Sequence, residues 1–388
     1  TYSPLMNIKR LETSRLFHRF GFGPRPGEYA QALKDGVQTT RTRLTTVPAA
    51  LTTSTPVALP AITDLGKRPK DKTPESVPFA LAMRSQTQQM GLWWLDMMAL
   101  SDHGLTERMV WFWHGHWATS IQKLNYALPM YKQNQIFRTH ALGNFNAMTK
   151  AMLNDGALQF WLDGQDNTAK APNENLGREL MELFVLGVNR YSEDDVKAIS
   201  RVLTGYQVEK SSGVVTINQN RRDANPVTLL GKTASFTGDS LTDFLVARDD
   251  CATFISERLW YRFISSTETM PTSFSAKKGF ATRDIATTIQ AMAADPSMSD
   301  EKYAMVKSPV EWFISACRAL ELTPSALKTP GQLNNHLDKL GQVPFNPPNV
   351  GGWPAGEAWL SSATAQYRLA FAAWLIKQSN LSALQQIP

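Results

Sequence analysis

A chain of 388 residues can bury a sizeable core and has room for one large domain or for roughly two or three average ones. Hydrophobic residues make up 43% and charged residues 19% of the sequence, and its apolar runs are too short and too interrupted to span a bilayer. The net charge is +6, but Lys and Arg are scattered without a basic arm or stripe, so no nucleic-acid partner is expected.

The first eighty residues are predicted to combine two short helices with a long irregular segment. Residues 8–23 read as a helix that runs into a turn rich in Gly and Pro, and residues 28–35 read as a second helix. Between residues 39 and 78 the composition shifts to Thr, Pro, Ala and Lys without periodicity. This composition predicts an irregular excursion, which suits a lid or a partner contact better than catalysis.

The middle of the chain is predicted to be helical. Helical periodicity covers residues 79–100, the aromatic stretch TERMVWFWHGHWATS and residues 131–153. A polar loop then leads into the helix PNENLGRELMELFVLG, which Gly187 is placed to end. Residues 192–203 predict a further helix with acidic residues in its first turn.

A small β element precedes the last helices. Residues 206–236 read as a short β-hairpin insertion with polar loops. Helices are predicted at 241–263, 281–294, 308–320 and 362–378, with the loop GQVPFNPPNVGGWPAGEAWL before the last of them. We therefore expect a mainly α fold: one multi-helix globular domain over residues 1–388, with a small β-hairpin excursion and long Pro/Gly-rich loops.

The helix at residues 172–187 carries the densest group of ionisable side chains. At roughly 100° per residue, Glu174, Arg178 and Glu182 fall within about an 80° arc, and Glu179 lies some 60° further round. Apolar residues border this arc, so its polar face is expected to pack against protein or to line a cleft. Two interpretations stay open: a structural network that pairs Arg178 with the glutamates, or a site with tuned carboxylates.

A second candidate is the pair His114 and His116. Two positions apart on a regular helix, they point in roughly opposite directions, so they converge only if the helix breaks near Gly115. Together with a carboxylate they would suit a divalent metal such as Zn²⁺, Mn²⁺ or Fe²⁺. The alternative is two structural histidines with satisfied hydrogen bonds.

Tryptophans and aspartates complete the candidate residues. Trp113, Trp117 and Trp353 belong to aromatic clusters that suit sugar stacking, although core packing is the more common role of such residues. Asp163 lies at the start of the loop before the glutamate helix, and Asp223 lies in the hairpin segment. All five are predicted to bind substrate.

Several common chemistries lack their signature motifs. The sequence has no GxSxG elbow, P-loop, dinucleotide-binding glycine fingerprint, HExxH or CxxC. Its two cysteines, Cys251 and Cys317, allow at most one disulfide, and two aspartates beside Cys251 disfavour its thiolate. Nucleotide, flavin and thiol chemistry are therefore disfavoured.

The stretches quoted above resemble, in order, those of the DUF1800 family of uncharacterised, mostly exported bacterial proteins. The resemblance runs through RLFHRFGFGPRPGE, FWHGHWATS, PNENLGRELMELFVLGVNRYSEDDVKAISRVLTGY, LLGK, KSPVEWFISACRAL and GQVPFNPPNVGGWPAGEAWL. It implies a mature periplasmic or extracellular chain and a partner among DUF1501 proteins, which look like sulfatase or phosphatase relatives. The sequence departs from the family at Arg222 and Val227, where the family usually has His and Lys.

Our leading hypothesis is an exported hydrolase or lyase that acts on a glycan or another envelope polymer by Glu/His acid-base chemistry. Glu174 or Glu182 would be the general acid or base, with Glu179 in the same catalytic cluster. Arg178 would orient the catalytic glutamate or bind an anionic group of the substrate, and His116 would assist. The alternative is a non-catalytic secreted binding or assembly protein in which the same charged residues form a buried structural network.

Overall fold

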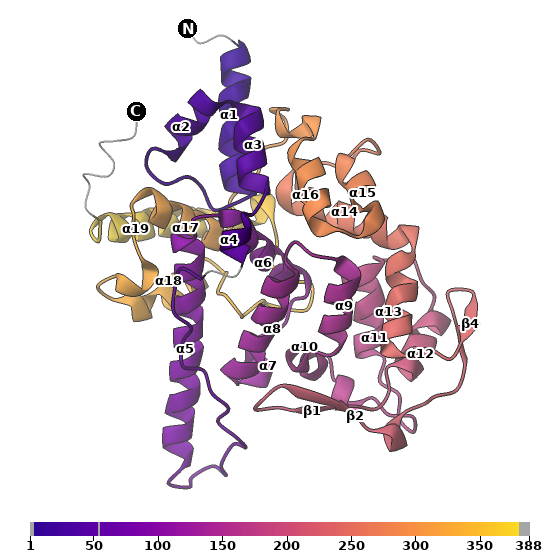
Figure 1. Cartoon of the computed structure of the whole chain (residues 1–388). Helices are drawn as coiled ribbons and strands as arrows, with labels where there is room; N and C mark the ends of the chain where they lie inside the picture. The colour runs from indigo at the N-terminus through magenta and orange to yellow at the C-terminus, as the bar shows by residue number, and fades with distance from the viewer. Residues whose placement is uncertain (1–3, 53–54, 380–388) are drawn as a thin grey trace.

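The computed structural model describes residues 4–52 and 55–379 and shows a mainly helical protein, as the sequence predicts (Figure 1). The α-helices are α1 Pro4–Arg19, α2 Glu28–Asp35, α3 Val37–Thr45, α4 Ala49–Thr52, α5 Ser76–Leu100, α6 Gly104–His116, α7 Ile121–Leu124, α8 Ala127–His140, α9 Phe145–Leu153, α10 Gly156–Trp161, α11 Asn175–Glu179, α12 Glu193–Val202, α13 Gly238–Ala247, α14 Asp249–Phe263, α15 Ser275–Gly279, α16 Ile285–Ala293, α17 Pro309–Ala319, α18 Leu333–Lys339 and α19 Ser362–Ile376. A π-helix, η2, spans Leu180–Val185. Short 3₁₀ turns lie at Gly164–Asp166, Gln219–Arg221, Phe280–Thr282, Pro296–Met298, Pro324–Ala326, Pro330–Gln332 and Gly356–Trp359.

The β excursion contains two hairpins where the sequence predicts one. Strand β1 (Tyr206–Glu209) pairs antiparallel with β2 (Val214–Ile217), and Tyr206 lies opposite Ile217. Strand β3 (Val227–Leu229) pairs antiparallel with β4 (Lys232–Ala234). The short turn between β3 and β4 falls on Leu230 and Gly231, both at positive φ, a backbone that matches the twist of a tight hairpin.

The segment predicted to be irregular from residue 39 to 78 begins inside a helix. Helix α3 covers Val37–Thr45 and packs against α1 and α16, and the hydroxyl of the buried Thr40 donates to the carbonyl of Ala32 at 3.3 Å. An ion pair between Arg41 and Glu12 adds a link to α1. Threonine has a low helix propensity, and the Thr-rich composition therefore predicted an irregular segment. The packing of α3 outweighs that low propensity. Residues 55–75 contain no helix or strand, as expected.

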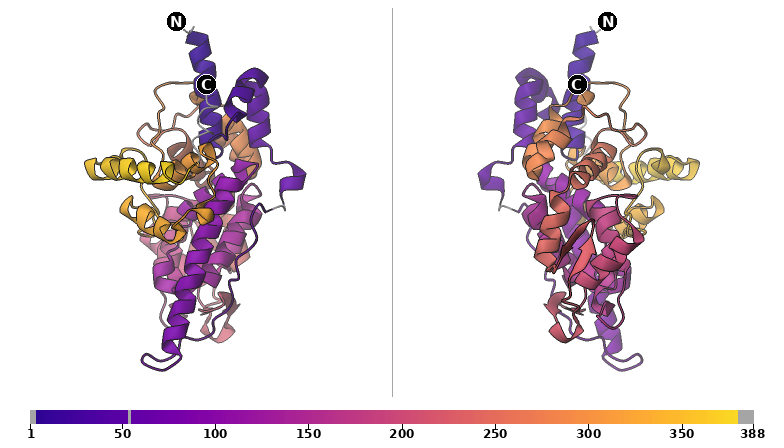
Figure 2. Two further views of the ribbon diagram at one scale, coloured as in Figure 1. Left: turned by 90° about the vertical axis from the view of Figure 1, so that its left-hand side faces the viewer. Right: turned by 90° about the vertical axis from the view of Figure 1, so that its right-hand side faces the viewer.

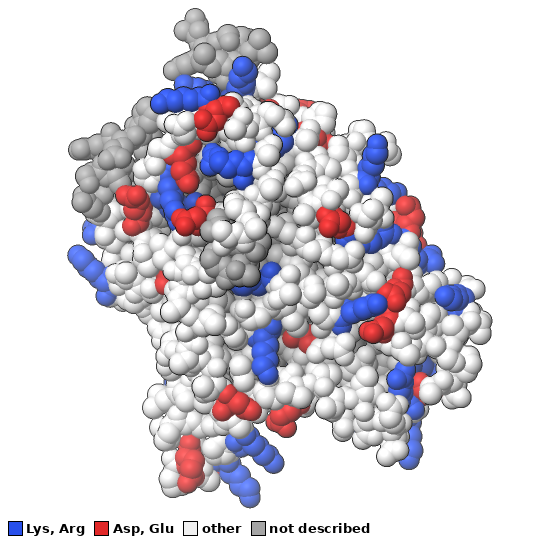
Figure 3. Space-filling view, viewed as in Figure 1, with Lys and Arg blue, Asp and Glu red and all other residues white. Residues whose placement is uncertain are grey.

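One continuous hydrophobic core runs through the molecule, from Leu16 to Leu375. Helix α6 lies at its centre between α5 and α8, and Figure 2 shows α5 extending along one side of the body. On the face shown in Figure 3, Lys and Arg are interspersed with Asp and Glu, in keeping with the scattered charge of the sequence.

No helix in the described part of the chain has the length and apolar character that crossing a membrane requires.

Candidate functional site

Helix α6 carries both histidines of the predicted pair and stays helical through Gly115 to His116. The break near Gly115 that convergence of the two histidines would require is therefore absent from α6. Buried aromatic side chains such as Trp111 and Trp113 hold the last turn of α6, and this packing outweighs the roughly 1 kcal/mol that glycine costs in a helix. His114 and His116 consequently point to different parts of the fold.

His114 holds the Pro- and Gly-rich loop against α6. Its ring is buried beside Trp94 and Trp353, and its Nε2 accepts a hydrogen bond from the backbone amide of Phe345 at 3.1 Å. Burial lowers the pKa of His114 to about 3, so the ring is neutral at physiological pH. This neutral ring, with an unprotonated Nε2, is the form that the hydrogen bond requires.

His116 fixes the glutamate helix to α6 through a hydrogen bond to its backbone. Its Nε2 lies 2.8 Å from the carbonyl oxygen of Phe184, so this nitrogen carries the proton and donates it. Burial, with a further contribution from Arg258, lowers the pKa of His116 to about 3. A general acid or base works best with a pKa near the working pH, so the structure argues against the predicted catalytic role of His116.

The predicted metal site at His114 and His116 lacks a ligand set. Across the residues that the structure describes, no group of three or more His, Cys, Asp and Glu side chains is placed to hold a metal ion. Each imidazole is instead engaged by a backbone group of a distant segment. The histidine motif therefore joins three segments of the fold, and the interpretation as structural histidines is the one that the geometry supports.

The glutamate helix begins as α11 and continues as the π-helix η2. Asn173, one residue before the N-cap Glu174, accepts through its side chain from the amide of Asn175 at 2.9 Å. As expected, Gly187, at a φ of 92°, ends the helix. A π-helix bonds residue i to i+5 and fits more residues into each turn, so the polar arc drawn for a regular helix does not continue past Leu180. This change of helical period was not predicted from the sequence. It turns the side chain of Glu182 away from the direction expected for a regular helix.

Arg178 forms an ion-pair cluster at the protein surface. Its guanidinium contacts Glu193 at 2.8 Å and Glu174 at 3.2 Å, and the side chains of Arg178 and Glu174 are 32% and 43% exposed. The expectation that this face packs against protein or lines a cleft is wrong for these residues. Exposed ion pairs of this kind contribute roughly 0–1 kcal/mol and leave no carboxylate free for chemistry.

Glu182 and Glu179 have different surroundings although they lie on the same helix. Glu182 accepts a hydrogen bond from the phenol of Tyr191, whose pKa is raised to about 12 by burial and by this carboxylate. Glu179 is half-buried and has no hydrogen bond or ion pair within residues 4–52 and 55–379. Burial and the neighbouring Glu182 raise its pKa.

The two aspartates predicted to bind substrate have structural partners. Asp163 contacts the ammonium of Lys123 at 2.5 Å and the amide of Asn175 at 3.4 Å, so it ties the loop before the glutamate helix to α7. Asp223 accepts from Arg201 on α12 at 2.7 Å. Both carboxylates are already compensated, and the structure places them apart from the histidines.

The three candidate tryptophans are divided between the core and a pocket. Trp113 and Trp117 are fully buried, and the indole nitrogen of Trp113 donates to the carbonyl of Ala141 at 3.1 Å. They have no surface to offer a sugar in this fold, so the packing does not support their predicted role in substrate binding. Trp353 stacks on Trp111 with ring centroids 5.2 Å apart, and both line a pocket.

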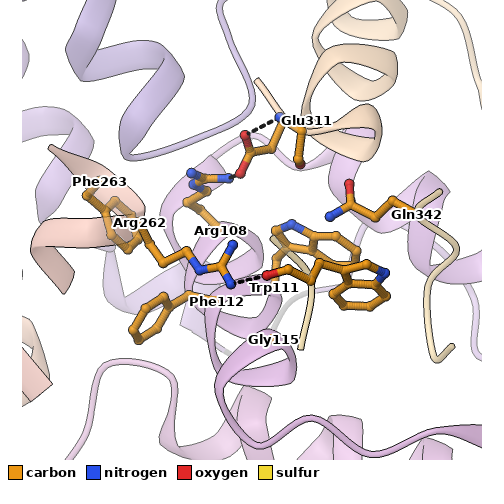
Figure 4. A pocket seen from close by; sticks show the side chains of 10 residues that line it. Arg108, Trp111, Phe112, Gly115, Arg262, Phe263, Glu311 and Gln342 are labelled. Atoms are coloured by element: carbon orange, nitrogen blue, oxygen red, sulfur yellow. Dashed lines mark hydrogen bonds and ion pairs between the residues drawn. The ribbon is translucent and has the colours of Figure 1, made fainter. Parts of the chain in front are cut away.

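This pocket lies between α6, α14, the start of α17 and the Pro- and Gly-rich loop (Figure 4). It encloses about 40 Å³, enough for a few atoms or an ordered water. The side chains that give it its character are Arg108, Trp111, Arg262, Glu311, Gln342 and Trp353. Gly115 forms part of the wall, where a methyl group in place of its hydrogen would meet no atom within 4 Å.

The polar groups of the pocket are mostly hydrogen-bond donors. Arg108 forms an ion pair with one oxygen of Glu311, and the other oxygen accepts from the amide of Ser308 at 3.0 Å. Arg262 donates to the carbonyls of Trp353 and Pro354.

Gln342 contributes a further donor to the pocket. Its side-chain oxygen accepts from the amide of Val310 at 2.9 Å, and Figure 4 shows its amide nitrogen turned toward the cavity. With its oxygen turned to the amide of Val310, the side chain directs its two N–H donors toward the cavity. The pocket therefore presents donors from Arg108, Arg262 and Gln342, while each oxygen of its carboxylate already accepts one hydrogen bond.

Positive charge at the pocket exceeds negative charge. Burial, together with the charges of Arg258 and Arg108, lowers the pKa of Arg262 to about 10. Arg258 lies one turn earlier on α14. Its guanidinium carbon is 5.8 Å from the centroid of the Tyr261 ring, and it has no hydrogen bond or ion pair within the described part of the chain. The nearby acid is Glu311. Burial alone would raise its pKa, but Arg108 and the amide of Ser308 outweigh burial and lower it.

The sequence analysis found Trp353 but missed Arg108, Arg262, Glu311 and Gln342. These residues come from three helices and a loop and meet only in the folded chain. One local signal was present, because Arg258 and Arg262 are four residues apart on α14. Like charges at this spacing destabilise a helix unless something compensates them.

The comparison with known proteins agrees with the motifs of the sequence. Residues 15–387 match the model of a family described as "Protein of unknown function (DUF1800)". No curated protein and no solved structure shows significant similarity to the chain. Because the matched region covers nearly the whole sequence, the chain belongs to the DUF1800 family.

Proposed function

We propose that this protein is a non-catalytic binding protein and that it recognises an anionic group in the pocket between α6, α14 and α17. One observation carries the proposal: Arg108, Arg262 and the amide of Gln342 face the cavity, while the oxygens of Glu311 are engaged. Guanidinium groups held in a partly dry site bind carboxylate, sulfate or phosphate through short charge-assisted hydrogen bonds.

The same lining disfavours catalysis at this place. Glu311 holds both Arg108 and the N-terminus of α17, and these contacts lower its pKa, so it is a weak base. His114 lies behind Trp353 with its Nε2 bonded to Phe345. A general acid or base must reach the substrate proton directly or through one water, and neither group is free to do so.

The size of the pocket supports recognition of one end group of a larger ligand. A cavity of about 40 Å³ has room for part of a sulfate or carboxylate, and the ring of Trp353 lies beside it. A polymer whose charged groups project from its chain could place one of them in the pocket and leave the rest of the molecule outside. An acidic polysaccharide or another acidic polymer of the cell envelope is such a ligand, which extends the proposal to a periplasmic or extracellular protein.

Replacement of Gly115 by alanine tests the proposal without weakening the fold. The added methyl group enters the open space of the pocket wall, so Gly115→Ala should lower the affinity for inorganic phosphate or glucuronate roughly tenfold or more. Its unfolding free energy should be equal to or above that of the wild type, because alanine favours a helix. Isothermal titration calorimetry and urea unfolding measure the two quantities.

Two further variants complete this experiment. Arg262→Gln should also lose anion affinity, whereas Arg248→Gln should not, because Arg248 lies elsewhere on the surface and pairs with Asp250. Wild-type affinity in both Gly115→Ala and Arg262→Gln, or no binding of either anion to the wild type, would overturn the proposed function.

A second candidate function, the hydrolase or lyase expected from the sequence, is favoured by the state of Glu179. This carboxyl is half-buried with a raised pKa, while Glu182 beside it is held by Tyr191, so one helix carries two carboxyls in different environments. Pairs of this kind divide the roles of acid and base in many enzymes.

Substitution of Glu179 separates this candidate from a structural role. Glu179→Gln should leave the unfolding free energy at pH 7 unchanged or raise it, because the charge it removes is disfavoured by burial and by Glu182. Glu182→Gln should lower it by roughly 1 kcal/mol, because Tyr191 then loses its charged acceptor. Urea unfolding checks both. Release of reducing ends from acidic polysaccharides by the wild type and by Glu179→Gln at equal rates would exclude Glu179 as the acid or base.

A further inference from the structure

A second cavity lies near the donor-lined pocket. It is an open groove of about 450 Å³ beside α1, and its polar lining comes from Ser14, Arg15, His18, Glu301 and Lys307. Lys307 lines the groove and the next residue, Ser308, lines the pocket, so the chain passes from one cavity to the other between these two residues. Arg108 and Glu311 of the pocket are close enough to act electrostatically on His18 in the groove, and Glu311 also acts on Lys307.

Lys307 brings an uncompensated positive charge to the groove. Within the residues that the structure describes, its ammonium has one hydrogen bond, a 3.4 Å contact to the hydroxyl of Ser315, and no carboxylate partner. Burial lowers the pKa of Lys307, while Glu311 acts in the opposite direction. An ammonium taken partly out of water without a counter-ion is costly, and a bound anion would offset that cost.

The other polar groups of the groove do not neutralise Lys307. Arg15 is positively charged and is engaged by the carbonyls of Met298, Asp300 and Tyr303, at 2.7–3.0 Å. Burial, Lys307 and Arg108 together lower the pKa of His18 to about 4, so its ring is neutral, and its buried Nδ1 has no partner among the described residues. Glu301 is the acid among the lining residues, and it is exposed to solvent.

From this arrangement we infer that the ligand is a linear polyanion with one charged group in the pocket and a second at Lys307. The inference rests on the proposed function, since it requires the pocket to bind an anion. Two linked charged groups that reach both cavities bind more tightly than one, because the second group binds at a high effective concentration. The Arg108 guanidinium lines the pocket and also acts on His18 in the groove, where it lowers the pKa of the ring.

A series of phosphates of increasing length tests the inference. At constant ionic strength, tripolyphosphate should bind at least tenfold more tightly than inorganic phosphate. The affinity for pyrophosphate shows whether a ligand with two phosphate groups is already long enough to reach both cavities. In Lys307→Gln, the affinity for phosphate should stay unchanged, while the gain from phosphate to tripolyphosphate should disappear. Lys307→Arg should retain that gain. Calorimetric titration gives each affinity.

A matched control is Lys302→Gln, because Lys302 is exposed beside Asp300 and does not line the groove. It should keep the full gain with chain length. Binding of phosphate that depends on Arg262, without any gain for longer chains or any effect of Lys307→Gln, would overturn the polyanion inference and leave the proposed function intact. Tight tripolyphosphate binding that needs Lys307 but not Arg262 would overturn the two-cavity ligand. Absence of all anion binding would overturn both proposals.

Discussion

Acidification from pH 7 to pH 4 should lower the free energy of unfolding by several kcal/mol. His114 and His116 are fully buried and neutral, with pKa values of about 3 in the folded protein against about 6.5 in the unfolded chain. A histidine with a depressed pKa contributes stability that is fully present above pH 6.5 and is lost as the pH falls toward 3. At pH 4 the loss is roughly 3 kcal/mol for each of the two, and His18, with a pKa of about 4, adds to it.

Carboxyls with raised pKa values oppose this trend, Asp155 most strongly. Asp155 accepts from the amide of Leu158 and from Gln133, but burial dominates and raises its pKa to about 7. The folded state therefore favours its protonated form, so acidification from pH 7 to pH 4 adds stability of roughly 3 kcal/mol. Burial also raises the pKa values of Asp96 and Glu179, but it lowers those of the remaining three histidines as well, so we expect the net effect to be a loss.

The variant His116→Gln isolates one of these contributions. Glutamine has an amide that can donate to the carbonyl of Phe184, and it does not titrate. Unfolding of the variant should therefore take up about one proton fewer between pH 6 and pH 4, so its unfolding free energy should depend less steeply on pH. His140→Gln is the control, because His140 is only half-buried and should change the slope less. Urea unfolding at pH 7, 6, 5 and 4 measures the slope. A wild-type protein as stable at pH 4 as at pH 7 would show that the two buried histidines are not neutral.

Local signals in the sequence account for the elements that were predicted well. Helix α2 has the predicted bounds, and α12 is capped by Ser192, with the expected acids in its first turn and a capping box to Asp195. Such signals lie within a few residues of each other, so the sequence alone shows them. Helix α3 is held by contacts with α1 and α16, and these contacts are invisible in its own composition.

The candidate site was predicted only in part, for a similar reason. The histidine motif, the glutamate helix and the Trp353 loop, which the sequence singled out, do meet in the fold, although the glutamate helix does not line the pocket. It did not indicate that His114 and His116 are bonded to the backbone amide of Phe345 and the carbonyl of Phe184. Those bonds depend on tertiary contacts and on the π-helix. No residue pattern in this segment predicts a π-helix.

Close approach of two backbones explains the glycine that precedes Trp353. Gly352 has a φ of 79°, in the left-handed region, and a Cβ there would collide with the carbonyl oxygen of Gly115 at the end of α6. The Pro- and Gly-rich loop thus lies directly on the helix that carries the histidine motif, and this contact positions Trp353 and its bond to Arg262.

Gly352→Ala should therefore destabilise the protein by roughly 3 kcal/mol or more, from the strained backbone and the collision together. It should also weaken phosphate binding, because Arg262 loses the carbonyl of Trp353 that orients it. Gly341→Ala is the matched control: its φ of 84° imposes similar strain, but its Cβ would make only an ordinary contact, 3.5 Å from the ring of Trp359. Urea unfolding of the two variants separates the cost of the strained backbone from the cost of the collision with α6. Equal losses would mean that backbone strain alone keeps glycine at position 352, whereas a larger loss in Gly352→Ala assigns the difference to the contact between the loop and α6.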